Sequence, residues 1–144
     1  MRIKQKKSLG QNFLRDKNSQ YKIISLCRFR PDDIVLEIGA GAGDITALIS
    51  RLVKTVYAVE IDRRFSEVLQ GRFVNSNVTV INFDILKLDL NKIFSSLQRK
   101  IKVFGNIPYY ITTPIIEFLI RHKSMIGEAY LTVQKELGER LCSG

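Results

Sequence analysis

Apolar residues along this chain fall in short runs that alternate with amphipathic segments. Runs rich in β-branched and aromatic residues predict buried strands at residues 34–38, 55–61, 77–82, 101–105 and 129–133. Helices are predicted by apolar positions at helical spacing, at residues 17–28, 44–52, 65–71, around 93–97, and at 114–122 and 134–141. Repeated alternation of strand and helix is typical of an α/β fold with a mostly parallel sheet and crossover helices.

Two helix starts carry capping signals. Asp16 precedes the first predicted helix and is expected to be its N-cap. Thr113 and Pro114 are expected to form the N-cap and first turn of the helix at 114–122. That helix follows the polar and aromatic stretch N-I-P-Y-Y, residues 106–110, which comes directly after the predicted strand at 101–105.

Length and composition indicate one soluble globular domain over residues 1–144, since 45% of the residues are hydrophobic. No apolar run reaches the roughly 18 residues of a membrane span, and no secretory signal is evident. With two isolated cysteines, Cys27 and Cys142, and one histidine, we expect free thiols in a reducing compartment and no metal site. We further expect a monomer located in the cytoplasm. A mitochondrial location, which a basic N-terminus could also suggest, is the less favoured alternative.

Positive charge is concentrated at the N-terminus. Residues 1–30 hold nine Lys or Arg residues and one acid, and so carry most of the net charge of +9. A basic segment, residues 1–15, attached to a nearly neutral domain favours a polyanionic partner, most simply nucleic acid. The alternative is a solvated tail that only aids solubility.

The loop E-I-G-A-G-A-G, residues 37–43, joins a predicted strand to a predicted helix. Glycines at such a junction let the backbone turn tightly and approach a ligand. A dinucleotide fingerprint would place its third glycine at position 44, where this chain has Asp44. An acid there would repel a pyrophosphate, which argues against NAD and favours a nucleoside ligand without phosphates, commonly S-adenosylmethionine.

Acidic residues follow the next two predicted strands. Glu60 comes 21 residues after Gly39, where a carboxylate accepts hydrogen bonds from ribose hydroxyls in sheets of this type, while Asp62 suits a helix cap. Asp84 could accept a hydrogen bond from an adenine amino group while the Ile85 amide donates to the ring, or it could simply close an Asx turn. Because carboxyl ends of parallel strands share one edge, we expect these residues and Asn106 to meet there.

The motifs K-S-L-G-Q-N-F-L (7–14), E-I-G-A-G-A-G, V-E-I-D (59–62), N-F-D-I-L (82–86), G-N-I-P-Y-Y-I-T-T-P (105–114) and V-Q-K-E-L-G-E-R-L (133–141) occur in this order. Together they resemble the ribosomal RNA adenine N6-dimethyltransferase family over residues 4–141. The resemblance implies a Rossmann-like methyltransferase sheet that binds S-adenosylmethionine. It assigns the cofactor contacts to Asn12, Leu14, Gly39, Gly41, Glu60, Ile61, Asp84, Ile85 and Asn106.

The resemblance also implies how the reaction proceeds. The Asn106 side-chain oxygen and a backbone carbonyl near Pro108 would accept the two amino hydrogens of the target adenine. Tyr109 would stack on the base, and Tyr110 would either extend that surface or pack beneath the loop. RNA phosphates would contact the basic N-terminal residues Lys4, Lys6, Lys7 and Arg15.

Within the family, Thr-Pro after the loop favours the branch that dimethylates two neighbouring adenosines near the 3′ end of small-subunit rRNA. The alternatives are the large-subunit branch that gives macrolide resistance and a non-catalytic RNA-binding assembly factor. The resemblance further implies a β-hairpin that completes the sheet and a small helical domain, neither of which is expected within residues 1–144. We therefore expect activity of a protein that contains these parts, and do not predict it for residues 1–144 by themselves.

Overall fold

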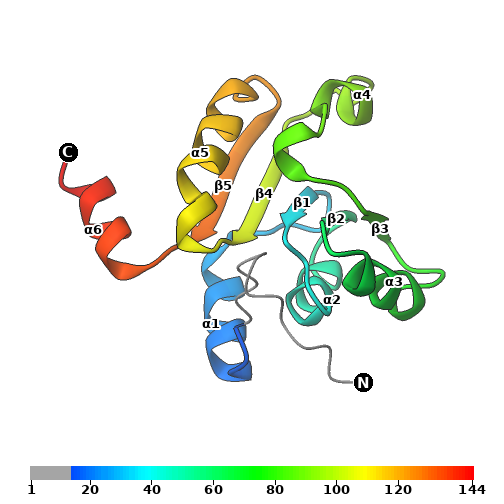
Figure 1. The fold of residues 1–144 in the computed structure, drawn as a ribbon. Coiled ribbons are helices and arrows are strands. Elements are labelled where there is room, and N and C mark those ends of the chain that lie inside the picture. The colour runs from blue at the N-terminus through cyan, green and yellow to red at the C-terminus, as the bar shows by residue number, and fades with distance from the viewer. Residues whose placement is uncertain (1–13) are drawn as a thin grey trace.

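A parallel five-stranded sheet lies at the centre of residues 14–144, which are the residues that the computed structural model describes. Its strands are β1 (Ile34–Ile38), β2 (Thr55–Val59), β3 (Val78–Ile81), β4 (Ile101–Asn106) and β5 (Ile126–Thr132). The helices are α1 (Lys17–Leu26), α2 (Asp44–Ser50), α3 (Arg63–Arg72), α4 (Leu90–Phe94), α5 (Thr112–Arg121) and α6 (Lys135–Cys142), with 3-10 turns η2 (Ile85–Lys87) and η3 (Tyr109–Ile111). The predicted α/β class is thus confirmed (Figure 1).

The strand order is β3-β2-β1-β4-β5, so β1 lies in the middle of the sheet. From β1 the chain winds outward through β2 to β3, then crosses back to β4 on the other side of β1. The order therefore reverses between β1 and β4, and open α/β sheets bind ligands at such a reversal, outside the carboxyl ends of the strands.

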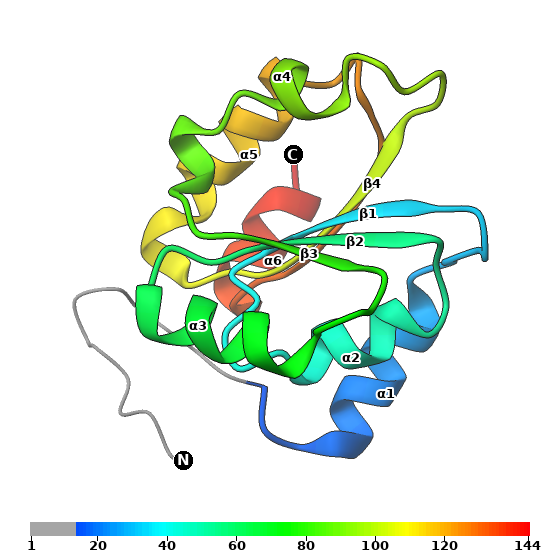
Figure 2. The ribbon, with the colours of Figure 1, turned by 90° about the vertical axis from the view of Figure 1, so that its right-hand side faces the viewer.

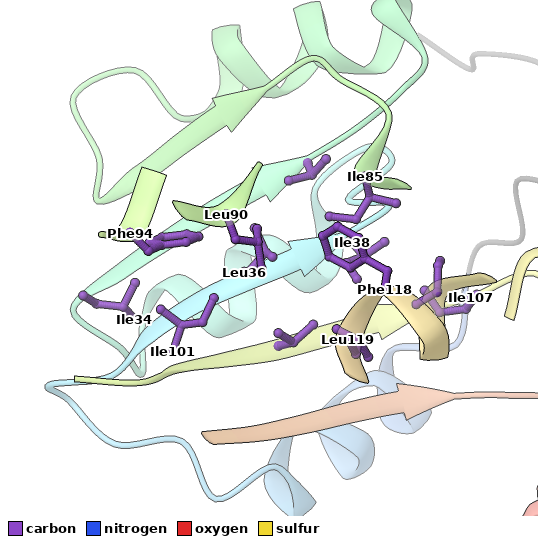
Figure 3. Packing of buried hydrophobic residues seen from close by; sticks show 13 residues of the cluster. Ile34, Leu36, Ile38, Ile85, Leu90, Phe94, Ile101, Ile107, Phe118 and Leu119 are labelled. Carbon is purple, nitrogen blue, oxygen red and sulfur yellow. The ribbon is translucent and has the colours of Figure 1, made fainter. Parts of the chain in front are cut away.

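Helices cover both faces of the sheet, with α1, α2 and α3 on one face and α4 and α5 on the other (Figure 2). On the α5 face, Leu36, Val103, Ile115 and Phe118 are almost completely buried in one cluster (Figure 3). Full burial of an aliphatic or aromatic side chain of this size stabilises a fold by about 1.5–3 kcal/mol. This layer therefore fixes α5 against β1 and β4, the two strands that flank the reversal.

A second cluster packs α1 and α2 against the opposite face around Val35, Ile49 and Phe104. Cys27 belongs to this cluster, and burial raises the pKa of its thiol to about 11. The neutral thiol lies 3.3 Å from the Ile23 carbonyl oxygen. Cys27 thus behaves as a small core residue, in agreement with its expected free thiol state.

The helix predicted at 114–122 is the main correction to the expected boundaries. Thr113 is not its N-cap, because α5 already begins at Thr112 and Ile111 occupies the cap position without a side-chain hydrogen bond. The reason lies in the preceding turn: the Thr112 hydroxyl donates to the Pro108 carbonyl at 2.9 Å, which draws Thr112 into helical geometry. Asp16, by contrast, is confirmed as the N-cap of α1, accepting from the Ser19 amide.

Other elements differ at their ends for similar local reasons. The strand predicted at 55–61 ends at Val59, because the Glu60 side chain accepts from the Asp62 amide and turns the chain. The strand predicted at 129–133 begins earlier, at Ile126, where it pairs with Ile101. The helices predicted to reach residues 28, 52 and 97 end at Leu26, Ser50 and Phe94, and Leu52 is exposed.

Candidate functional site

One pocket lies at the carboxyl edge of the sheet, where the chain leaves β1, β2, β3 and β4. Seven predicted cofactor residues line it: Gly39, Gly41, Glu60, Ile61, Asp84, Ile85 and Asn106. Asn106, Ile107 and Pro108 line its other side. Gly39 and Pro108 are 69 positions apart in the sequence, and both line this pocket. The parallel topology predicted that the strand ends would meet in this way.

The glycine loop lines this pocket through Gly39 and Gly41, in a conformation that few other residues adopt. Gly39, Gly41 and Gly43 have φ angles of 71°, 57° and 91°, all in the left-handed region. The amides of Gly39 and Ala40 both donate to the Val59 carbonyl oxygen, at 2.9 and 3.2 Å. The loop is therefore tied to the end of β2.

Glu60 connects that loop to the turn after β2. Its Oε2 accepts from the Gly41 amide at 2.8 Å, and its Oε1 accepts from the Asp62 amide at 2.9 Å. Burial raises the pKa of Glu60, and the two amide donors act against that shift. A carboxylate offers about four lone-pair sites, so two amide bonds are compatible with further donors such as a diol.

Asp62 and Asp84 both cap the element that follows them. The Asp62 side chain accepts from the Arg64 amide at the start of α3, as its sequence position predicted. Asp84 accepts from the Leu86 amide at 3.0 Å with Oδ1, so it does close an Asx-type turn. Asp84 also lines the pocket, so closing the turn is compatible with a ligand role.

Asn82 and Phe83 contribute to the site and were not singled out from the sequence. The Asn82 side-chain amide donates to the backbone carbonyls of Glu60 and Ile61, at 2.8 and 3.3 Å. It thereby joins the turn after β2 to the turn after β3. Phe83 lines the pocket with 47% of its side chain exposed. The polar N-F-D stretch at a strand end was the available signal for both residues.

Glu37 lies below the glycine loop as a fully buried acid. Burial raises the pKa of its carboxyl to about 8, with the Glu60 carboxylate adding to the increase and the Thr46 hydroxyl opposing it. Its Oε2 has no hydrogen-bond partner within residues 14–144. Glu37 lines a second small pocket with Leu14, Gly39 and Asn106, next to the first pocket. An orphaned polar atom beside left-handed glycines suits a ligand that brings its own hydrogen-bond donors.

The loop after β4 holds its polar groups in defined positions. The Asn106 side-chain oxygen accepts a hydrogen bond from the Thr132 hydroxyl. The Pro108 carbonyl accepts from the Thr112 hydroxyl at 2.9 Å and from the Ile111 amide at 3.3 Å. Both lone pairs of that oxygen are therefore in use.

Tyr109 and Tyr110 follow Pro108 and precede Ile111, two residues that line the pocket, and are 64% and 49% exposed. Their rings pack edge to face, with centroids 5.8 Å apart and an interplanar angle of 87°. Tyr110 thus supports the ring of Tyr109 from the side. An exposed, braced aromatic ring beside a pocket is a suitable stacking surface for a nucleobase.

The N-terminal motif is only partly within the described chain. Leu14 is half-buried against the second core cluster, and its carbonyl accepts a hydrogen bond from the buried Gln20 side chain. Arg15 is exposed and lines the second pocket. Asn12, Lys4, Lys6 and Lys7 lie outside the described residues. Among residues 14–144, every helix is too short or too polar to cross a membrane.

Comparison with known proteins places this geometry in a family context. The family model described as ribosomal RNA adenine dimethylase matches residues 2–144. A curated relative from Fusobacterium nucleatum, ribosomal RNA small subunit methyltransferase A, is 43% identical over 99% of this chain and 54% of its own length. A relative of the same name from Syntrophus aciditrophicus is also 43% identical, over 98% of this chain and 51% of its own length. The chain therefore spans about half the length of these relatives.

Solved structures support the same relationship. The 23S rRNA methyltransferase ErmE superposes with a TM-score of 0.76 at 30% identity, covering 88% of this chain and 49% of that protein. A dimethyladenosine transferase from Plasmodium falciparum superposes with a TM-score of 0.74 at 31% identity, covering 92% of this chain and 46% of that protein. The Rossmann-like methyltransferase fold is thus shared with a 23S rRNA methyltransferase and a dimethyladenosine transferase.

Proposed function

Because the chain belongs to the ribosomal RNA adenine dimethylase family, we propose that the protein dimethylates N6 of two neighbouring adenosines near the 3′ end of small-subunit rRNA. S-adenosylmethionine is the proposed methyl donor. The observation that carries the proposal is the single pocket shared by the glycine loop, Glu60, Asp84 and Asn106. Names of curated relatives at 43% identity support the small subunit as the source of the substrate.

Residues of the first pocket would hold the cofactor by its polar groups. Glu60 would accept from the ribose hydroxyls, while Asp84 and the Ile85 amide would bind the adenine edge. Gly39 and Gly41 present backbone close to the ligand because no side chain intervenes. Asn12 and Leu14 complete the proposed set on the methionine side. When bound, S-adenosylmethionine supplies an electrophilic methyl group on a sulfonium.

Asn106 and its loop would prepare the target nitrogen for attack. The adenine amino group is a weak nucleophile because its lone pair is delocalised into the ring. Acceptance of its two hydrogens by the Asn106 side-chain oxygen and the Ile107 carbonyl would localise that lone pair on nitrogen. Pro108 has a fixed φ of −60°, and its carbonyl is bonded to Thr112, so the acceptors are held in place before the base arrives.

Base and backbone of the RNA would contact different parts of the protein. Tyr109, braced by Tyr110, would stack on the adenine that enters the pocket. Residues 1–15, including Arg15 and the three lysines before it, form the proposed phosphate-binding segment of a methyltransferase domain at residues 1–144. Methylation of ribosomal subunits would take place in the cytoplasm, and we expect the protein to act as a monomer.

The proposal is tested by transfer of tritiated methyl groups from S-adenosylmethionine to small ribosomal subunits that lack the modification. The full-length gene product is used, with Asn106→Ala as the active-site variant and Asn91→Ala as the matched control. Asn91 is an exposed asparagine on α4, at the opposite edge of the sheet. We expect two methyl groups per modified adenosine, a loss of at least a hundredfold for Asn106→Ala and no loss for Asn91→Ala. Cofactor binding without any transfer by the unmutated protein would refute an enzymatic function and favour an assembly factor.

Large-subunit rRNA is the second candidate substrate, because ErmE shares the fold at 30% identity. The same assay distinguishes the two by competition between small and large subunits or their naked rRNAs. Preferential labelling of large-subunit rRNA would favour this second candidate. We expect the label to remain with the small subunit when both are present.

A further inference from the structure

Thr132 lies at the end of β5, next to Asn106 of the proposed reaction site. In the sheet register Thr132 is the direct partner of Asn106, the last residue of β4. Neighbouring residues in register on parallel strands direct their side chains to the same face. The two side chains therefore meet at the carboxyl edge, although 26 positions separate them in sequence.

Two contacts join Thr132 to the loop that carries the acceptors. Its hydroxyl donates to the Asn106 side-chain oxygen, and its backbone carbonyl accepts from the Ile107 amide at 3.3 Å. One residue thus contacts both positions whose oxygens would receive the amino hydrogens. Thr132 is half-buried and outside the first pocket, so it acts on Asn106 from behind.

The orientation of an asparagine amide is the property that such a contact controls. The terminal torsion of Asn is broad, and its oxygen and nitrogen can exchange places by rotation. Threonine is β-branched and stiff at χ1, so its hydroxyl is itself held in one direction. An amide oxygen accepts two hydrogen bonds, so a bond from Thr132 is compatible with a second donor from a substrate.

Packing below the loop leaves Asn106 little freedom other than this torsion. A Cβ atom at Gly105 would lie 2.5 Å from Ile107 Cδ1 and 3.4 Å from Leu131 Cδ2. The Ile107 side chain therefore folds back over Gly105, and the backbone on both sides of Asn106 is fixed. The rotation of its carboxamide is the remaining variable, and the bond from the Thr132 hydroxyl constrains it.

We infer that Thr132 is a positioning residue, which orients the Asn106 carboxamide for methyl transfer to the adenine amino group. The inference rests on the proposed function. It predicts an effect on the rate of the chemical step and not on cofactor or RNA affinity, because Thr132 acts through Asn106. Removal of the Thr132 hydroxyl should slow methyl transfer, whereas removal of its methyl group alone should not.

The experiment compares Thr132→Val, which keeps the shape and removes the hydroxyl, with Thr132→Ser, which keeps the hydroxyl. Thr79→Val, at an exposed threonine of β3, is the matched control. In the full-length protein we measure kcat and KM for methyl transfer to small subunits, and the cofactor Kd by calorimetry. For Thr132→Val we expect kcat to fall about three- to tenfold, with KM and Kd within about twofold. Thr132→Ser and Thr79→Val should retain the rate.

A double-mutant cycle provides the sharper readout. In an Asn106→Ala background, Thr132→Val should cause no further loss, since the group that it orients is absent. An unchanged kcat in Thr132→Val, an equal loss in Thr132→Ser, or additive losses in the double variant would each overturn the inference. Thr132→Ala replaces the Val variant if that variant does not fold.

NMR spectra of side-chain amides test the contact between Thr132 and Asn106 independently of the proposed function. In ¹⁵N-labelled protein, the Asn106 NH₂ resonances should shift in Thr132→Val and remain in place in Thr132→Ser. Unmutated protein that transfers no methyl group would refute the proposed function and with it the positioning role. Active protein whose Asn106 resonances are insensitive to Thr132→Val would refute only the contact inferred here.

Discussion

Replacement of Glu37 by glutamine should stabilise the protein increasingly as the pH rises. Glu37 is fully buried below the glycine loop, and burial raises the pKa of its carboxyl from 4.5 to about 8. The folded state therefore holds this proton more tightly than the unfolded state does. The contribution of Glu37 to stability is most favourable below pH 4.5, falls as the pH rises towards 8, and above pH 8 stays at its lowest value without further change with pH.

The magnitude follows from the size of the shift. Each unit of pKa difference corresponds to about 1.4 kcal/mol, so a shift from 4.5 to about 8 corresponds to about 5 kcal/mol above pH 8. Relaxation around the ionised group reduces this value, and we expect a measured effect of about 2–4 kcal/mol. Glutamine has nearly the same shape and does not titrate, so the wild type should lose stability relative to Glu37→Gln.

Urea denaturation at pH 5.5, 7.0 and 8.5 measures the difference directly. Glu60, whose pKa is also raised by burial, titrates in both proteins and largely cancels in the comparison. Glu117→Gln, at an exposed glutamate of α5, is the matched control and should show a pH-independent difference. Parallel stability curves for wild type and Glu37→Gln from pH 5.5 to 8.5 would refute the reasoning, because they would mean that Glu37 ionises in the folded state as it does in water.

Three further changes test the site and its support. Gly43→Ala should destabilise the protein by about 1–3 kcal/mol in thermal unfolding, because φ is 91° and the added Cβ would lie 2.8 Å from the Leu69 side chain. Gly71→Ala is the control: its added Cβ would have no neighbouring atom within 4 Å, so this variant should be as stable as the wild type or more stable. Equal destabilisation by the two substitutions would contradict this. Asn82→Ala should weaken cofactor binding about three- to tenfold in calorimetry, because the turn that carries Glu60 loses two hydrogen bonds, and unchanged affinity would contradict this. RNA binding by the full-length protein should weaken steeply between 50 and 200 mM salt in filter binding, and removal of residues 1–15 should flatten that slope.

The predictable part of this fold is the part decided by local pattern. Short runs that are apolar except for one residue, such as I-V-L-E-I at residues 34–38 with Glu37, are long enough for a strand and too short for a buried helix, which indicated the element type. Alternation of strand and helix then implied parallel pairing, and parallel pairing places every strand end at one edge. Gly39, Glu60, Asp84 and Asn106 could be brought into one pocket by that topology alone.

Element ends were less predictable, since they depend on single side chains that reach back to the backbone. Thr113-Pro114 is a good helix start by composition, yet α5 begins at Thr112 because the Thr112 hydroxyl bonds to the Pro108 carbonyl. In the same way, the bond from the Asp62 amide to Glu60 ends β2 two residues early. Propensity describes each residue separately, whereas these bonds depend on the path of the turn.

The supporting contacts of the site are the least accessible from sequence, for a geometric reason. Thr132 meets Asn106 only because the register of β4 and β5 places them opposite one another, and a shift of one residue would turn the threonine to the other face. Asn82 likewise reaches Glu60 only after β2 and β3 have paired. Residues that touch a ligand carry a recognisable chemistry, but residues that orient them do so by their position, and position exists only in the folded chain. Activity at a site of this kind should therefore depend on polar residues at strand ends. Their residue type alone does not distinguish them from ordinary surface residues.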